Sequence, residues 1–186
     1  MKNPKLPFSN DNPIELEIGM GRPHFIFERA LAVPEHNIVG IEYKREWVEK
    51  AIARKAREHI ANVHAIHAHA WELVPTLLEP ESVVNIVVNF PDPWWKKRHH
   101  KRRILNPDFV EVLVSKLQTG GTFFLQSDVS GLFDEYLQNL EENPGLKNVY
   151  GPKGQCPDNP MHAQSHREKK CVELGIPIYR ALLRRV

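Results

Sequence analysis

The sequence predicts an open, doubly wound α/β sheet, and three observations lead to this fold class. Short apolar runs of strand length alternate along the chain with segments whose apolar residues recur at helical spacing. The run SVVNIVVNF (82–90) is almost continuously apolar, as a central parallel strand is. Polar or glycine-containing turns follow where the runs end. Strand and helix in repeated alternation predict a parallel sheet with helices on both faces.

The first strands and helices follow from residues 14–60. IELEIGMG (14–21) is a short strand that runs into a glycine turn. The helix expected at 22–33 has Pro23 in its first turn, where the missing N–H would be unpaired in any case. NIVGIEY (37–43) is a buried-strand candidate, and KREWVEKAIARKAREHI (44–60) is strongly amphipathic, with Trp47, Ala51, Ile52 and Ala56 expected on one side.

The remaining segments complete the alternation. NVHAIHAH (62–69) has the two-residue period of a strand, and a weak helix at 71–78 precedes the central strand. A helix at 106–117 begins with Asn106 as N-cap and a proline next to it. The last expected elements are a strand at 120–128, a helix at 131–143, a strand at 146–151, a polar loop at 151–164, a helix at 165–174 and a strand at 176–185.

Length and composition are those of an ordinary globular protein. The 186 residues, of which 41% are hydrophobic and 26% charged, are expected to form one domain over 1–186, with 1–13 as a flexible N-terminal arm. Two separate cysteines predict neither a disulfide framework nor a zinc site and favour a reduced cytoplasmic location. No segment resembles a signal peptide or reaches membrane-spanning length.

Ligands of such sheets bind beyond the carboxyl ends of the strands. The residues expected at these ends, and therefore expected to lie together, are Glu17 to Gly21, Glu42, His69, the segment 89–103 and Asp128.

The first two strand ends predict a nucleoside-type cofactor. Gly19 and Gly21 allow close backbone approach, and Glu42, about twenty residues later, suits the two hydroxyls of a ribose. The alternative for Glu42 is an ordinary acid before a helix. A dinucleotide would require the full glycine fingerprint, and Glu17 would oppose its pyrophosphate. Glu17 therefore favours S-adenosyl-L-methionine, which is cationic and carries no phosphate.

The segment NFPDPWWKKRHHKRR (89–103) combines one fixed acid with a dense basic run. Pro91 and Pro93 restrict the backbone around Asp92 and place its carboxylate in advance. Two tryptophans offer surfaces for a base or for core packing, and six Lys or Arg residues, Arg102 and Arg103 among them, can neutralise phosphates. Because the formal net charge is only +2, this basic patch is local and indicates a phosphate-rich partner. A solvated charged face is the alternative.

The motifs EIGMG, GIEY, NFPDPWWKKRHHKRR, QSD, SHREKK and PIY, in that order, closely resemble the bacterial tRNA (guanine-N7)-methyltransferases over roughly residues 14–185. The resemblance implies a Rossmann-like class I S-adenosylmethionine-dependent methyltransferase sheet, mostly parallel with an antiparallel last strand. It also implies methyl transfer to N7 of a variable-loop guanine in tRNA, by a monomer or homodimer without a metal. Since guanine N7 has a lone pair and no proton, alignment and charge stabilisation are enough, and no general base is needed.

The resemblance also implies roles for single residues. Cofactor contacts are expected at Glu17, Gly19, Gly21, Glu42, His69 and Asp92, and Asp92 is also the expected catalytic residue, a carboxylate between cofactor and guanine. Substrate contacts are expected at Lys96, Asp128, Ser165 and Glu168, in addition to Arg102 and Arg103.

Departures from the family pattern keep two other functions open. Pro23 takes the place of a third glycine, His69 that of an aspartate, and Ser165-His166-Arg167-Glu168 that of Thr-x-Phe-Glu. These changes would suit a catalytically impaired RNA-binding protein on a methyltransferase fold. The histidines would suit a metal-dependent nuclease, although no HExxH and no paired carboxylates accompany them.

Overall fold

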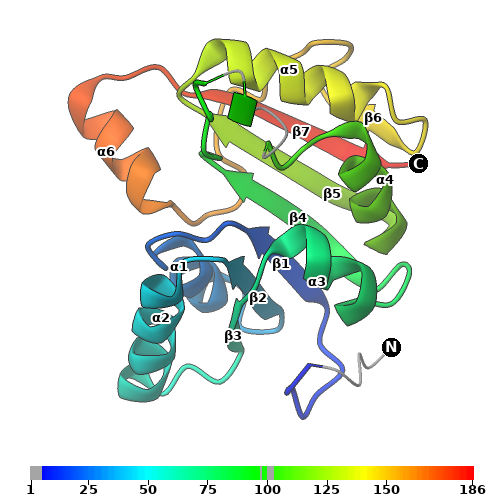
Figure 1. The fold of residues 1–186 in the computed structure, drawn as a ribbon. Coiled ribbons are helices and arrows are strands. Elements are labelled where there is room, and N and C mark those ends of the chain that lie inside the picture. The colour runs from blue at the N-terminus through cyan, green and yellow to red at the C-terminus, as the bar shows by residue number, and fades with distance from the viewer. Residues whose placement is uncertain (1–5, 97, 100–102) are drawn as a thin grey trace.

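The computed structural model describes residues 6–96, 98–99 and 103–186, and the strands in that part form one seven-stranded sheet (Figure 1). Its order is β3-β2-β1-β4-β5-β7-β6. The strands are β1 (Ile14–Ile18), β2 (Asn37–Glu42), β3 (Val63–His67), β4 (Val83–Asn89), β5 (Leu117–Ser127), β6 (Leu146–Asn148) and β7 (Tyr179–Arg185). The helices are α1 (Phe25–Ala32), α2 (Arg45–Glu58), α3 (Ala70–Leu77), α4 (Pro107–Lys116), α5 (Ser130–Glu141) and α6 (His166–Leu174).

The sheet confirms the expected topology. Pairs among β1 to β5 are parallel, whereas β7 runs antiparallel to both β5 and β6. From β1 the chain proceeds outward to β3 and then returns to β4 on the other side of β1. The strand order therefore reverses between β1 and β4, which is where ligands bind in doubly wound sheets.

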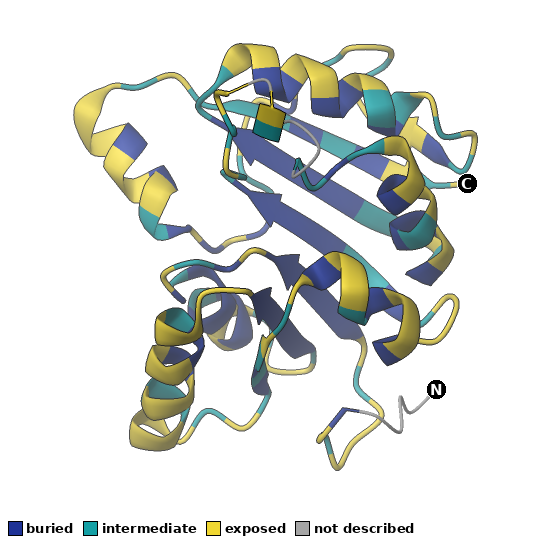
Figure 2. Cartoon of the chain, in the orientation of Figure 1, coloured by how far each residue is buried: buried dark blue, intermediate teal, exposed yellow. Residues whose placement is uncertain are grey.

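Helices cover both faces of the sheet because the strands are apolar on both. On β4, Ile86 and Val88 pack with α3, α4 and α5, while Val87 between them packs with α1 and α2. Figure 2 shows the central strands buried and the outer helix surfaces exposed. On α2 the expected inner face is partly wrong, since Ile52 is exposed and Val48 is buried together with Ala51.

Local sequence signals explain several element ends. The Asn106 side chain accepts the Phe109 N–H at 3.0 Å, which confirms this residue as the N-cap of α4. Ser165 caps α6 in the same way through Glu168 N–H at 3.1 Å. The fifth strand begins at Leu117, earlier than expected, because a bulge opposite Val84 accommodates Gly120 with a φ of +81°.

The described part of the N-terminal arm contacts the body of the protein. Leu6 is buried in the core, Phe8 meets His64 edge to face, and Asn37 donates to Asn10 Oδ1 at 2.7 Å. No helix within the described ranges is long and apolar enough to cross a membrane.

Candidate active site

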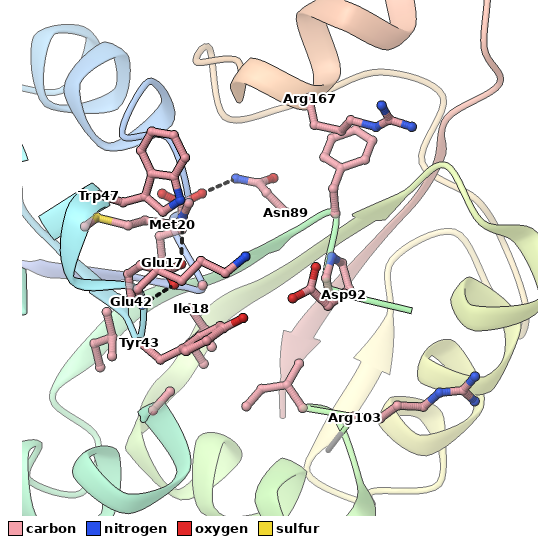
Figure 3. Close-up of a pocket in the computed structure, with 18 of the residues that line it drawn as sticks. Glu17, Ile18, Met20, Glu42, Tyr43, Trp47, Asn89, Asp92, Arg103 and Arg167 are labelled. Carbon is pink, nitrogen blue, oxygen red and sulfur yellow. Dashed lines mark hydrogen bonds between the residues drawn. The ribbon is translucent and has the colours of Figure 1, made fainter. Parts of the chain in front are cut away.

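A cavity of about 1060 Å³ lies at the carboxyl ends of β1, β2, β4 and β5. It brings together most of the residues expected from the sequence: Glu17, Gly19, Gly21, Glu42, His69, Asp92, Arg103, Asp128 and Ser165. Lys96 lines a smaller cavity of about 490 Å³ that shares Asp92 and Trp95 with the larger one. Arg102 lies outside the described residues. The expectation that the strand ends cluster along one edge is thus confirmed (Figure 3).

The glycine turn after β1 is fastened to the end of β2. Gly19 N–H donates to Ile41 O at 2.8 Å, and Gly21 N–H donates to Glu42 Oε2 at 2.9 Å. Both glycines have positive φ, +71° and +49°, and the space next to their Cα atoms is open. Pro23 is buried and does not line the cavity. The replacement of the family's third glycine by Pro23 therefore does not alter the wall of the cavity.

Glu42 is held by backbone groups on both of its oxygens. Besides the Gly21 contact, its Oε1 accepts the Lys44 N–H at 2.8 Å, and the residue is buried. A carboxylate oxygen has room for more than one hydrogen bond. The Glu42 carboxylate is therefore fixed in orientation while it keeps acceptor capacity toward the cavity.

Glu17 has a different environment from Glu42. Its Oε1 accepts from Asn89 Nδ2 at 2.6 Å, whereas its buried Oε2 has no hydrogen-bond partner among the described residues. Burial raises the pKa of Glu17 to about 8, the charge of Glu42 adds to this, and the Asn89 hydrogen bond opposes it. Without a ligand, this group therefore holds a proton at neutral pH.

His69 and Tyr43 form the side of the cavity beyond β2 and β3. Their rings stack with centroids 5.6 Å apart and planes 11° from parallel. Trp47 also lines the cavity, below the guanidinium of Arg22 at 5.4 Å from the ring centroid. These rings offer a flat aromatic surface near Glu42.

The turn that carries Asp92 has an unusual backbone. Phe90 and Trp94, on either side of Pro91-Asp92-Pro93, have φ values of +48° and +47°, a region that aromatic residues rarely occupy. Hydrogen bonds help to hold the turn: Phe90 N–H donates to Gln126 O at 2.8 Å, and Arg103 donates to Pro93 O at 3.2 Å from Nε and 3.1 Å from Nη2.

The side chains of Asp92 and Arg103 differ in exposure and in partners. Asp92 is exposed, and its carboxylate has no hydrogen bond or ion pair with other described residues. Arg103 is mostly buried and also pairs with Glu135. Its guanidinium therefore supports the turn, a role that sequence reasoning missed because nothing in the basic run distinguishes it from its neighbours.

The first turn of α6 closes one side of the cavity. Arg167 donates to Asp128 Oδ2 through Nε at 3.1 Å and through Nη2, and Arg22 contacts His166 Nε2 at 2.7 Å. Figure 3 shows Asp92, Arg103 and Arg167 on the opposite side from Glu17, Glu42 and Tyr43. In Figure 1 the arrowheads of β4 and β5 point toward the side on which α6 lies.

Glu168 does not line the cavity. Its buried carboxylate accepts from Gln126 Nε2 at 3.0 Å, from Asn159 Nδ2 at 2.9 Å and from Arg180 Nη2 at 3.1 Å. These contacts tie α6 to β5, to β7 and to the loop before α6. A substrate contact by Glu168 stays a prediction.

Metal ligation was the basis of one alternative function. Within residues 6–96, 98–99 and 103–186, no group of three or more His, Cys, Asp or Glu side chains is arranged to hold a metal ion.

Comparison with known proteins gives concordant findings. Residues 11–181 match a family described as putative methyltransferase. A tRNA (guanine-N(7)-)-methyltransferase of Synechococcus sp. (strain JA-3-3Ab) is 39% identical over 173 residues, which are 93% of this chain and 72% of that protein. The fold resembles 16S rRNA methyltransferase KamB (TM-score 0.68, 12% identity, 94% and 89% of the two chains). It also resembles a SAM-dependent O-methyltransferase from Thermotoga maritima (TM-score 0.59, 15% identity, 94% and 60%).

Proposed function

Because the chain belongs to the family of tRNA (guanine-N(7)-)-methyltransferases, we propose that it transfers a methyl group from S-adenosyl-L-methionine to N7 of a variable-loop guanine in tRNA. The observation that carries this proposal is the cavity at the sheet's switch point. It joins a glycine turn and two buried carboxylates on one side to the constrained Asp92 on the other.

The residues of the cavity fit the cofactor. Glu42 has an oriented carboxylate suited to the ribose hydroxyls, and the glycine turn leaves open space beside Gly19 and Gly21. The buried Oε2 of Glu17 has no partner among the described residues, and a positively charged ligand would pair with it once Glu17 has lost its proton. The Tyr43–His69 stack is an aromatic surface that suits packing of an adenine.

The chain's own residues have to orient two reactants, since guanine N7 needs no base. S-adenosyl-L-methionine supplies a methyl group activated by its positive sulfonium. In this proposal Asp92 accepts from the N1 and N2 hydrogens of guanine, and the support is the turn that carries it, which Arg103 holds. In that position its carboxylate stabilises the positive charge that methylation creates on the purine.

The tRNA side of the proposal uses exposed residues around Asp92. Trp95 is 74% exposed and Lys96 is exposed next to it, which suits stacking on a base and contact with a phosphate. Asp128, Ser165 and Arg102 are further proposed contacts. A tRNA substrate also agrees with the reduced cytoplasmic setting that the cysteines favour.

The impaired RNA-binding alternative finds little support. It rested on Pro23 and His69, yet Pro23 lies behind the cavity, and His69 takes part in an aromatic stack that lines it. The family match extends over residues 11–181, which include the Asp92 turn.

The test is transfer of a tritiated methyl group to unmodified tRNA. We expect incorporation by the wild-type protein, and loss of more than about a hundredfold with Asp92→Asn. Binding of tRNA should be retained in this variant. Asp134→Asn is the matched control, because Asp134 is an exposed aspartate of α5 away from the cavity. Incorporation at the wild-type rate by Asp92→Asn would overturn the role of Asp92, and no incorporation by the wild type would overturn the proposed function.

A further inference from the structure

Four buried polar side chains form a continuous hydrogen-bonded row across the sheet, from the cavity to α6. Asn89 Nδ2 donates to Glu17 Oε1 at 2.6 Å, and Gln126 Nε2 donates to Asn89 Oδ1 at 2.7 Å. The same Gln126 nitrogen donates to Glu168 Oε2 at 3.0 Å. None of the four residues is more than 7% exposed. Burying such a row costs free energy unless its polar atoms are hydrogen-bonded. At the cavity end of the row, Glu17 Oε2 has no hydrogen-bond partner among the described residues.

Arg180, at the α6 end of the row, determines which amide atoms donate and which accept along it. A guanidinium only donates hydrogen bonds. Arg180 Nε donates to Gln126 Oε1 at 3.3 Å, so the other amide atom of Gln126, its nitrogen, faces Asn89. Asn89 must then accept with Oδ1, and its nitrogen must face Glu17.

This donor-to-acceptor direction determines which oxygen of Glu17 accepts a hydrogen bond. Because Asn89 donates to Oε1, and a carbonyl oxygen accepts better than a hydroxyl oxygen, the contact favours the proton of Glu17 on Oε2, the oxygen without a partner among the described residues. Burial and the neighbouring charge of Glu42 hold the pKa of Glu17 near 8, so this proton is present at neutral pH. No cation in the described part of the chain pairs with the group.

Other charged and titratable groups share the cavity with Glu17. They come from the glycine turn, the turns after β2 and β3, α3, the Asp92 turn, the segment before α4, the end of β5 and α6: Arg22, Tyr43, Lys44, His69, Glu72, Asp92, Arg103, Asp128, His166 and Arg167. Among the described residues, Glu42 is the one whose charge acts on Glu17 to a resolved extent.

We infer that Asn89 and Gln126 are positioning residues, whose aligned amides leave Oε2 of Glu17 free to give up its proton when the positively charged cofactor binds. The inference rests on the proposed function. In the step, the Oε2–H bond breaks and its proton passes to solvent. The negative charge that remains on the carboxylate faces the positive charge of the ligand. The amides disfavour the opposite arrangement, in which the proton would reside on Oε1.

Calorimetry with S-adenosylhomocysteine and S-adenosylmethionine tests this directly. Titrations at about pH 7 in buffers of different ionisation enthalpy count the protons released. We expect close to one proton released per S-adenosylmethionine for the wild type, and fewer per S-adenosylhomocysteine, because the sulfur of that ligand carries no positive charge. Glu17→Gln, titrated at ligand concentrations at which it still binds, should release none, which separates Glu17 from the other groups in the cavity.

The positioning role requires a change beside Glu17 that leaves Glu17 itself in place. Asn89→Ala should weaken cofactor binding at pH 7 by on the order of tenfold, because a hydrogen bond to the charged form is lost. It should also move the pH at which affinity rises to a higher value. Asn85→Ala is the matched control, since Asn85 of the same strand donates to Glu15 Oε1 at 2.9 Å in the same manner. Asn85→Ala should keep the wild-type dependence of cofactor affinity on pH.

The outcomes are distinguishable. A wild-type protein that binds neither ligand contradicts the proposed function. A wild-type protein that binds S-adenosylmethionine without proton release contradicts the inference alone, and this measurement needs no variant to fold. Equal pH profiles for wild type and Asn89→Ala would likewise refute the positioning role.

Discussion

Replacing Glu17 with glutamine should stabilise the ligand-free protein by an amount that grows with pH. Burial raises the pKa of Glu17 from 4.5 to about 8. Between these values, the unfolded chain loses the proton while the folded protein keeps it. The free energy of unfolding of the wild type therefore falls as pH rises, and the loss is complete above the folded-state pKa. Glutamine has no proton to lose, so the variant escapes this effect.

The magnitude follows from the width of that window. Each pH unit inside it changes the free energy of unfolding by about 1.4 kcal/mol. From about pH 5.5 to 7.5, the advantage of Glu17→Gln over the wild type should therefore grow by about 2–3 kcal/mol. Solvent that reaches Glu17 through the cavity would reduce this figure but would not change its sign.

Glu15, two residues earlier on β1, is a control of opposite sign. Burial acts to raise its pKa, but the hydrogen bonds and charge of Arg29, with hydrogen bonds from His36 and Asn85, lower it overall. The stability that Glu15 contributes is present above the unfolded-state pKa and is lost as pH falls through the folded-state value. Glu15→Gln should therefore destabilise the protein at neutral pH, and less so in acid.

Urea denaturation of the three proteins across a pH series makes the comparison. The reasoning is refuted if the difference between Glu17→Gln and wild type does not change with pH. It is refuted as well if both variants shift stability in the same direction at pH 7.5.

Two further predictions concern the tRNA side of the cavity and α6. Arg103→Ala should lower kcat because it releases the Asp92 turn, and it should barely change the salt dependence of tRNA binding. Lys96→Ala should instead reduce the slope of log K for tRNA binding against log salt by about 0.7–0.9. Filter binding at several salt concentrations, combined with single-turnover methylation, checks both, and a reduced salt slope in Arg103→Ala would show a phosphate contact instead. Ser165→Ala should cost about 1 kcal/mol of unfolding free energy through loss of the α6 cap, measured with urea, and an unchanged midpoint would count against the cap.

The fold and the location of the site follow from short-range patterns. Alternation of strands and helices predicts the sheet, and the carboxyl-end rule places Glu42 and Asp92 together because it depends only on which residue ends a strand. The strand beginning at Leu117 was missed in part because Gly120, normally a strand breaker, lies in a bulge.

Residues of the same type differ in function because they contact residues that are far away in the sequence. Glu15 and Glu17 have the same position in the β1 alternation, yet Arg29 reaches one and not the other. The pairing of Asn89 with Gln126 depends on the register of β4 against β5, which neither strand specifies alone. No local pattern carries such information.

Glu17 and Glu42 are buried, whereas Asp92, Trp95 and Lys96 are exposed. This difference in burial has a kinetic consequence for the proposed reaction. A polynucleotide held by the exposed residues lies between the buried carboxylates and bulk solvent. The cofactor then has to arrive first, and its demethylated product has to depart last. Steady-state patterns with S-adenosylhomocysteine as inhibitor should accordingly be competitive against S-adenosylmethionine and non-competitive against tRNA.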